Sequence, residues 1–304
     1  MRMTRLLLAS MIVFGGALHA QSLSSDAPPP RFRDPDRRAK LARAFADVDK
    51  LVRDFAQARN VPGWGYGIVI DGELAHISVG GLRNVATGAP VDTSTVFRIA
   101  SMSKSFAAAS ILQLRDAGKL SLDHPVELYV PELAKLKYPT GDSPRITIRD
   151  LLSHSAGFPE DNPWGDQQLA VTDADMSRMM QQGIPFSTAP ATNYEYSNFG
   201  FAILGRVVAN VSGMPYARYL SENILRPLGM TVTTLEAASV PESRLAHGYR
   251  RQDGEWLEEA QLPDGAFGPM GGILTSISDL SRWVAFMLDA WPPRDGADNG
   301  PVKR

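Results

Sequence analysis

The sequence predicts an α+β fold, and three observations lead to this prediction. The chain has 304 residues, 44% hydrophobic and 21% charged, a composition typical of a globular protein with a substantial core. Two short apolar runs, residues 64–70 and 74–79, meet at Asp71-Gly72, a strong signal for a tight β-hairpin. Apolar residues recur at helical spacing on both sides of this hairpin. A sheet accompanied by several helices is therefore expected.

The N-terminus has the pattern of a secretory signal peptide. Arg2 and Arg5 precede an apolar run over residues 6–14, and small residues follow as far as Ala20. We expect cleavage after Ala20, with cleavage after Ala17 as the alternative. The run is shorter than the roughly 20 residues of a membrane-spanning helix, so no stable membrane span is expected after cleavage, and the protein is expected to be secreted or periplasmic.

The rest of the chain divides into a leader and one domain. Residues 21–36 are rich in Ser, Asp and Pro and are expected to form an extended leader after the signal peptide of residues 1–20. Residues 37–304 are expected to form the folded domain. Apolar residues over 41–55 then predict an amphipathic helix with one buried face, which ends near Asn60 and Pro62.

The glycines at the start of the first apolar run predict close packing rather than a nucleotide site. Gly63, Gly65 and Gly67 are not followed by a helix, as a dinucleotide-binding loop would require. A strand that packs closely against its neighbours is the expected structure.

Further helices are predicted by their start and stop signals. One begins at the Ser101 segment and stops at Gly118, and a capping box at Thr147 to Asp150 opens a short one. The other predicted helices cover residues 173–182, 199–211, closed by Gly213, and 278–289. A two-stranded hairpin alone is marginally stable, so we expect the remaining strands of the sheet to lie beyond Arg304.

Charge and residue types exclude several functions. The formal net charge is −2, and the basic residues are scattered, which gives no reason to expect a nucleic-acid partner. The absence of cysteine excludes disulfides, thiolate metal sites and a Cys nucleophile. The five histidines show no paired spacing for zinc, and no metal or cofactor is expected.

Ser101-Met-Ser-Lys104 is a candidate nucleophile with its base. Ser101 lies where an extended segment enters a helix, and Lys104 follows on the same helical face within reach of it. If that face is buried, desolvation lowers the pKa of Lys104 and makes a neutral amine able to accept the serine proton. Taken alone, the tetrad is more simply explained as a helix cap followed by an exposed lysine.

Tyr196-Ser-Asn198 strengthens this hypothesis. A tyrosine beside a cation such as Lys104 can relay protons, and the amide of Asn198 can hold both a substrate and the lysine. The alternatives are a core aromatic residue and a helix cap. His154 is expected to make a structural hydrogen bond rather than to act in catalysis, and no Gly-x-Ser-x-Gly elbow occurs.

Five segments resemble the serine β-lactamases of class C type and the related penicillin-binding proteins, D-aminopeptidases and esterases. They occur in the order of that family and begin at Phe97, Ile146, Tyr194, Arg226 and Gly271. The resemblance implies an antiparallel sheet flanked by helices plus a helical subdomain, with the site between them. It also implies a nucleophile at Ser101, a base at Lys104, a proton relay at Tyr196 and substrate binding by Asn198.

The third motif of this family has no counterpart in the 304 residues. No Lys-Thr-Gly or His-x-Gly follows Asn198. In the family, the strand that carries this motif supplies one of two oxyanion donors, and loss of one donor costs about 2.7–4 kcal/mol. We therefore expect a chain that is truncated before the C-terminal strands.

The expected function is that of an exported serine hydrolase that forms an acyl-enzyme on Ser101. The expected substrate is an ester, a D-amino-acid peptide or a β-lactam, that is, a small molecule or a peptidoglycan-like compound. One alternative is a penicillin-binding or sensor module that is acylated without turnover. Another is an inactive truncated copy, and the oligomeric state is left open.

Overall fold

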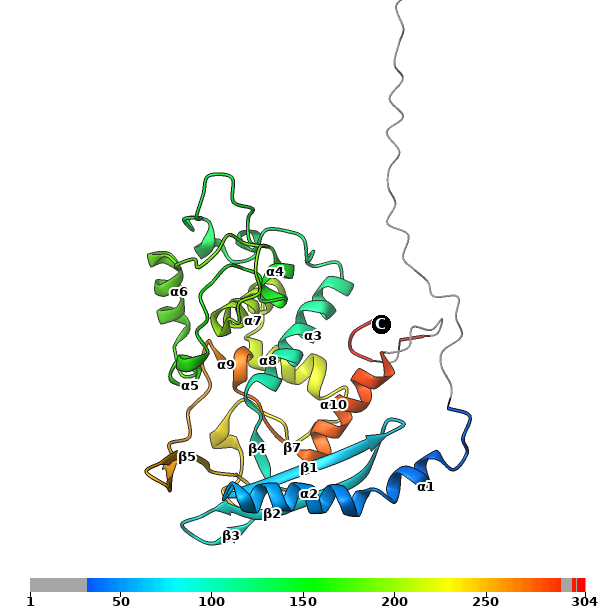
Figure 1. The fold of residues 1–304 in the computed structure, drawn as a ribbon. Helices are drawn as coiled ribbons and strands as arrows, with labels where there is room; N and C mark the ends of the chain where they lie inside the picture. Colours follow the sequence, from blue (N-terminus) through cyan, green and yellow to red (C-terminus); the bar gives the residue numbers. More distant parts are fainter. Residues whose placement is uncertain (1–31, 291–296, 299, 304) are drawn as a thin grey trace, which may run out of the picture.

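The computed structural model describes residues 32–290, 297, 298 and 300–303 (Figure 1). The predicted signal peptide, both of its possible cleavage sites and residues 21–31 of the leader lie outside this part and stay predictions. The first helix begins at Arg37. Among the helices that the model describes, none combines the length and hydrophobicity needed to span a membrane.

The described residues form α-helices, 3₁₀ turns, one π-helical turn and short sheets. The α-helices are α1 (Arg37–Ala42), α2 (Phe45–Ala58), α3 (Ser103–Asp116), α4 (Ile148–Leu152), α5 (Gly165–Gln168), α6 (Asp173–Gln182), α7 (Asn198–Ser212), α8 (Tyr216–Leu220), α9 (Gly268–Gly271) and α10 (Ile277–Asp289). The strands are β1 (Gly63–Ile70), β2 (Glu73–Asn84), β3 (Ala89–Pro90), β4 (Val96–Arg98), β5 (Gly248–Gln252), β6 (Glu255–Glu259) and β7 (Leu274–Ser276). The 3₁₀ turns are Ala100–Met102, Val126–Leu128, Pro131–Leu133, Asn162–Trp164 and Ala237–Ser239, and the π-helical turn is Ser221–Leu225.

The predicted hairpin is confirmed as the antiparallel pair β1–β2, to which β3 adds a third strand. Asp71 and Gly72, between the paired residues Ile70 and Glu73, have φ values of 53° and 79°. Two successive positive φ values are those of a type I′ turn, whose twist matches that of the flanking strands. Within this sheet β1 is an edge strand, bonded to β2 alone.

Two helices cover opposite faces of this sheet. A Cβ atom on Gly67 would come within 2.9 Å of the side chain of Ile277 at the start of α10, so the predicted close packing of the glycines is confirmed. On the other face the hydroxyl of Tyr66 donates to Asp49 of α2 at 2.5 Å. The small residues of β1 thus let α10 approach the sheet.

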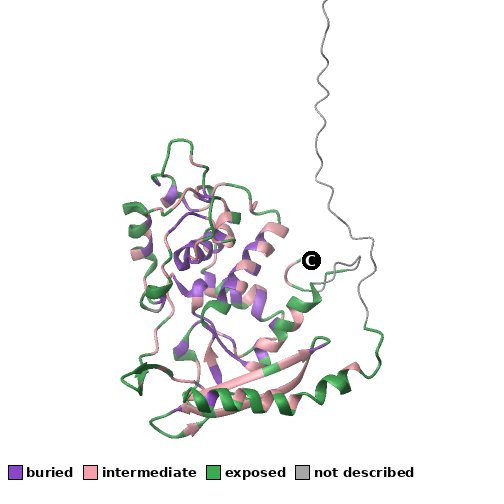
Figure 2. Cartoon of the chain, in the orientation of Figure 1, coloured by how far each residue is buried: buried purple, intermediate pink, exposed green. Residues whose placement is uncertain are grey.

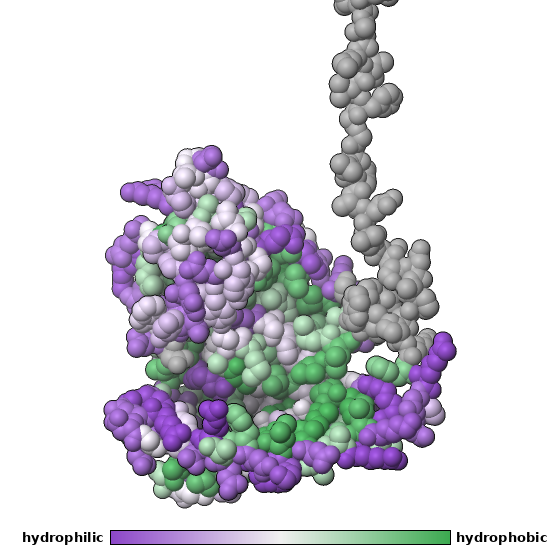
Figure 3. Space-filling model, viewed as in Figure 1, coloured by the Kyte–Doolittle hydropathy of each residue, from purple (hydrophilic) through white to green (hydrophobic). Residues whose placement is uncertain are grey.

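The first predicted helix differs from the structure in two ways. It is divided into two helices: α1 ends at Ala42, and α2 begins at Phe45. Its apolar face is only partly buried: Phe45, Val48 and Val52 are half-buried, whereas Phe55 is 60% exposed. Helical spacing predicts which residues share a face, but burial depends on what lies opposite that face. Figure 3 shows further hydrophobic surface over β1 and α10.

The core lies in the helical part of the molecule, around α7 and α3 (Figure 2). Ten residues of α7 are buried, from Asn198 to Val208. Gly213 ends the helix with a φ of 73°, as predicted. The predicted capping box of Thr147 and Asp150 is also confirmed at the start of α4. These helices surround the segment that follows β4.

The short strands β4 and β7 link the helical part to the sheet. Val96 pairs with Ser276 and Arg98 with Leu274 in antiparallel register, and the N–H of Ile99 donates to the carbonyl of Ile273. β4 leads into Ser101, whereas β7 leads into α10. The pairing of β4 with β7 and the hairpin β5–β6 were not predicted from the sequence.

Candidate active site

Ser101 lies in a 3₁₀ turn (Ala100–Met102) between β4 and the start of α3. The prediction that an extended segment enters a helix at this point is confirmed. Ser101 is exposed, whereas Ser103 and Lys104 are buried. Ala100, immediately before the serine, has a φ of 45°, a left-handed conformation that costs a non-glycine residue about 1–2 kcal/mol. The turn leaves Ser101 accessible to solvent, while Ser103 and Lys104 enter the core.

Lys104 is buried beside the serine, on the same helical face. Its side-chain nitrogen Nζ lies 3.2 Å from Ser101 Oγ. It also donates to the side-chain oxygen of Asn198 and to the carbonyl oxygen of Met270 in α9, each at 2.7 Å. These contacts hold the amine against the serine, which the motif spacing alone predicts only as within reach.

The surroundings of Lys104 favour its neutral form. Burial lowers the pKa of Lys104 to about 8, and the negative charge of Asp161 partly opposes this effect. A pKa near 8 leaves about a tenth of the amine neutral at pH 7. Lys104 can therefore accept a proton within the ordinary pH range.

Tyr196 also contacts the serine hydroxyl. Its hydroxyl donates to Ser101 Oγ at 2.5 Å, and Lys104 Nζ lies 4.8 Å from the centre of its ring. Burial raises the pKa of Tyr196, although the hydrogen bond to Ser101 acts in the other direction. Tyr196 is thus a neutral proton donor in the resting site, and Lys104 is the group suited to act as base.

The structure brings the four predicted residues, Ser101, Lys104, Tyr196 and Asn198, into one cluster. It also shows what His154 does: Nδ1 accepts the N–H of Ser197 at 3.0 Å, and the imidazole ring stacks on Tyr196 at 4.5 Å between centroids. Burial and the charge of Lys104 lower the pKa of His154 to about 4. A neutral ring that accepts at Nδ1 carries its proton on Nε2. The expected structural hydrogen bond of His154 is present.

Two participants were missed by the sequence analysis. Asp161 accepts the backbone N–H groups of Asn198 and Phe199, at 2.6 and 2.8 Å. Met270 takes part through its backbone carbonyl, which any residue could supply. No spacing or motif marks Asp161, but Gly271-Gly272 after Met270 is a sequence signal for close backbone approach.

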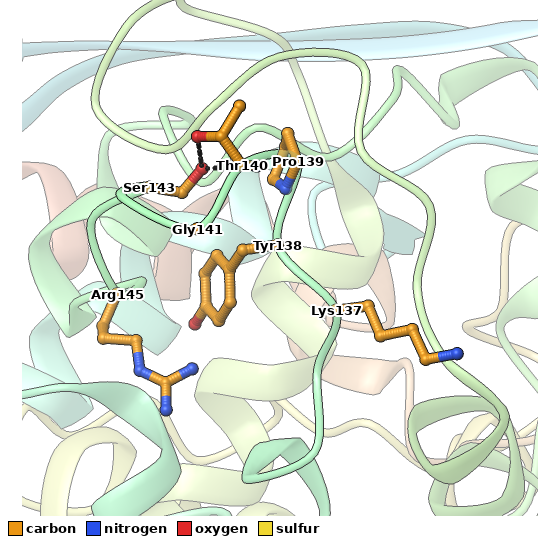
Figure 4. A pocket seen from close by; sticks show the side chains of 7 residues that line it. All are labelled: Lys137, Tyr138, Pro139, Thr140, Gly141, Ser143 and Arg145. Atoms are coloured by element: carbon orange, nitrogen blue, oxygen red, sulfur yellow. Dashed lines mark hydrogen bonds between the residues drawn. The ribbon is translucent and has the colours of Figure 1, made fainter.

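Elsewhere in the described chain there is a hollow that is separate from this cluster. The loop of residues 137–145 forms this hollow of about 470 Å³. Figure 4 shows the side chains that line it. The hydroxyls of Thr140 and Ser143 hydrogen bond to each other there, and Arg145 lies 5.0 Å from the Tyr138 ring. None of the four clustered residues lines this hollow. Within the described residues, no three His, Asp or Glu side chains gather as a metal ion would require.

A serine between a lysine and a tyrosine, in a two-part fold of sheet and helices, identifies the serine β-lactamase and penicillin-binding-protein-like superfamily. The chain belongs to its Beta-lactamase family, whose model matches residues 48–301. The fold class predicted from the resemblance is thereby confirmed. Membership in this family supports serine hydrolase activity in the broad sense.

Individual relatives cover most of this chain but only part of their own length. "Protein flp" of Staphylococcus aureus (strain N315) is 30% identical over 254 residues, 81% of this chain and 49% of that protein. The octameric penicillin-binding protein homologue from Pyrococcus abyssi is 27% identical, with a TM-score of 0.69 over 82% of this chain and 57% of that one. D-alanine carboxypeptidase AmpC from Burkholderia cenocepacia is also 27% identical, with a TM-score of 0.67 over 81% of this chain and 64% of that one. The chain spans about half the length of the curated relatives it matches.

Proposed function

We propose that the protein is an exported serine hydrolase that forms an acyl-enzyme on Ser101. The observation that carries this proposal is the position of Ser101 Oγ, 3.2 Å from the Lys104 amine and 2.5 Å from the Tyr196 hydroxyl. A nucleophile needs a base within hydrogen-bond reach and a proton donor for the leaving group. This site supplies both.

Acylation follows from these positions. The neutral amine of Lys104 takes the proton of Ser101, and Oγ attacks the carbonyl carbon of the substrate. As the bond to the leaving group breaks, Tyr196 gives its proton to that group. The site is left with a lysine ammonium and a tyrosine phenolate, and these opposite charges stabilise each other at the ring distance of 4.8 Å.

Deacylation reverses these proton transfers. The Tyr196 phenolate takes a proton from water, whose oxygen attacks the acyl carbon. Ser101 Oγ then leaves and recovers its proton from the Lys104 ammonium. The Oδ1 atom of Asn198 accepts from Lys104, and its NH₂ group is the part proposed to bind the substrate.

The proposed substrates are an ester, a D-amino-acid peptide or a β-lactam. The D-alanine carboxypeptidase and the class C β-lactamases to which the chain is similar support the last two classes. Each of these substrates reacts by acyl transfer to a serine, so the proposed steps apply to all three.

The acyl-enzyme is tested with a fluorescent fluorophosphonate probe on the wild type and on Ser101→Ala. We expect labelling of the wild type and none of the variant, while Ser103→Ala serves as a control for a nearby hydroxyl. Equal labelling of wild type and Ser101→Ala would remove Ser101 from the mechanism. The burst with a chromogenic ester then distinguishes turnover from acylation without turnover: many product equivalents per chain support a hydrolase, and one equivalent contradicts turnover.

Export is proposed from Arg2, Arg5 and the apolar run that follows them. Its test is the mass of the protein recovered from the periplasm of a Gram-negative bacterial host that expresses residues 1–304. We expect a mature chain that begins at Gln21. Recovery of the unprocessed chain from the cytoplasm alone would contradict export.

A further inference from the structure

The second motif of the site, Tyr196-Ser-Asn198, is held in place by a loop that lies far from it in the sequence. The carboxylate of Asp161 bonds the N–H groups of Asn198 and Phe199, the first two residues of α7. The first N–H groups of a helix have no partner within the helix, and a negative charge at that end is favourable. One side chain therefore satisfies two donors at the start of α7.

Neighbouring contacts complete this arrangement. The N–H of Glu195 donates to the carbonyl of His154, and that of Ser197 donates to the His154 ring. The N–H of Gly200 donates to the side chain of Ser197. Tyr196 and Asn198 stand on either side of Ser197, so their side chains are directed by a backbone that His154 and Asp161 fix at both ends.

Asp161 is also the negative charge that acts on the cluster. It raises the pKa values of Lys104, His154 and Tyr196; for Lys104 and His154 this opposes the effect of burial, whereas for Tyr196 it adds to it. The titratable groups around Lys104 are thus Asp161, His154 and Tyr196, of which the last two are neutral in the resting site. The charge on Asp161 and the charge on Lys104 stabilise each other.

We propose that Asp161 is a positioning residue, which fixes the second motif and serves as the counter-charge of Lys104. The inference rests on the proposed function for its effect on rate. Its effect on Lys104 itself is independent of catalysis.

Two readouts test the proposal on Asp161→Asn. The first is the titration of Lys104, followed through its ¹³Cε resonance in lysine-labelled protein and assigned by its loss in Lys104→Arg. The second is the fluorophosphonate labelling rate between pH 6 and 9. We expect the Lys104 midpoint to fall by roughly 0.5–1 unit and the labelling rate at high pH to fall on the order of 10-fold.

Asp150→Asn is the matched control, because Asp150 also accepts a backbone N–H at a helix start but is not among the groups that shift Lys104. Asp161→Glu keeps the charge and should restore the Lys104 midpoint. If Asp161→Asn does not fold, Asp161→Ser gives the same two readouts. An unchanged midpoint overturns the role as counter-charge, and an unchanged high-pH rate overturns the positioning role. Absence of Ser101 labelling in the wild type would instead contradict the proposed function and leave the NMR test intact.

Discussion

The Nζ atom of Lys104 lies 2.7 Å from the carbonyl oxygen of Met270, a residue 166 positions further along the chain. The lysine of the first motif is thus anchored by a peptide group as well as by Asn198. A backbone carbonyl is not protonated in the ordinary pH range. It therefore accepts a hydrogen bond from Lys104 whether the amine is charged or neutral. This contact connects the chemistry of Ser101 to the packing of α9.

The labelling rate of Ser101 should depend on pH through Lys104. Because burial lowers the pKa of Lys104 to about 8, the neutral amine is the minor form at pH 7 and the major form at pH 9. We expect the rate of fluorophosphonate labelling to rise about 10-fold between these pH values. Lys104→Arg should lower the rate by about 10²–10⁴-fold, since arginine stays protonated. Lys119→Arg is the exposed control, and a rate independent of pH would argue against Lys104 as base.

His154 should make the protein less stable in mild acid. The folded-state pKa of about 4 lies below the ordinary histidine value of 6.5, so the unfolded state binds more protons between these values and stability falls as the pH drops through this window. His154→Asn keeps an acceptor for the N–H of Ser197 and suits the φ of 56° at this position. From pH 7 to pH 5 the wild type should lose about 1 kcal/mol more than this variant, after allowance for solvent screening. Urea unfolding at both pH values measures this, and equal losses would contradict the neutral ring.

Gly205 should be intolerant of a methyl group, because α7 and α9 approach closely there. A Cβ atom on Gly205 would lie 2.2 Å from the Pro269 side chain, whereas one on Gly200 in the same helix would have its nearest contacts at 3.6 Å. We expect Gly205→Ala to cost about 1–3 kcal/mol and to slow labelling of Ser101, since Pro269 precedes Met270. Gly200→Ala should leave stability unchanged or slightly higher. Thermal unfolding combined with labelling separates the two variants, and equal behaviour would refute the contact.

Alanine at position 72 should destabilise the hairpin turn through its backbone conformation and not through a side-chain clash. Neither Gly72 nor Gly141 has an atom within 4 Å of an added Cβ, but only Gly72 of the two has a positive φ, 79°. Gly72→Ala should therefore lower the free energy of unfolding by about 1–2 kcal/mol, and Gly141→Ala should not lower it. Chemical unfolding of both variants is the measurement. A loss of the same size in Gly141→Ala would assign the effect to something other than the turn.

Local signals predicted most of the helices and the main hairpin correctly. Asp71-Gly72, the Thr147 to Asp150 capping box and Gly213 each act through contacts within a few residues, so their effect can be read from a short window of sequence. The grouping of Ser101, Lys104, Tyr196 and Asn198 was reached by adding a family resemblance to these signals.

Features that depend on contacts between distant residues could not be predicted from local sequence signals. β4 and β7 have three residues each, too few for a hydrophobic period, and they are held by backbone bonds to each other and to residues 234 and 244–246. Asp161 bonds residues 37 and 38 positions away, and nothing in its own neighbourhood distinguishes it from a loop carboxylate. The exposure of Phe55 likewise depends on what stands opposite α2 rather than on its spacing.

The large sequence separations within the site also bear on the order of folding. Ser101 meets the Tyr196 hydroxyl across 95 positions, and Lys104 meets Met270 across 166. Contacts between distant residues close large loops and tend to form slowly. Labelling pulses applied at successive times during refolding would therefore record when these segments assemble. The reactivity of Ser101 would then report how late in folding the site forms.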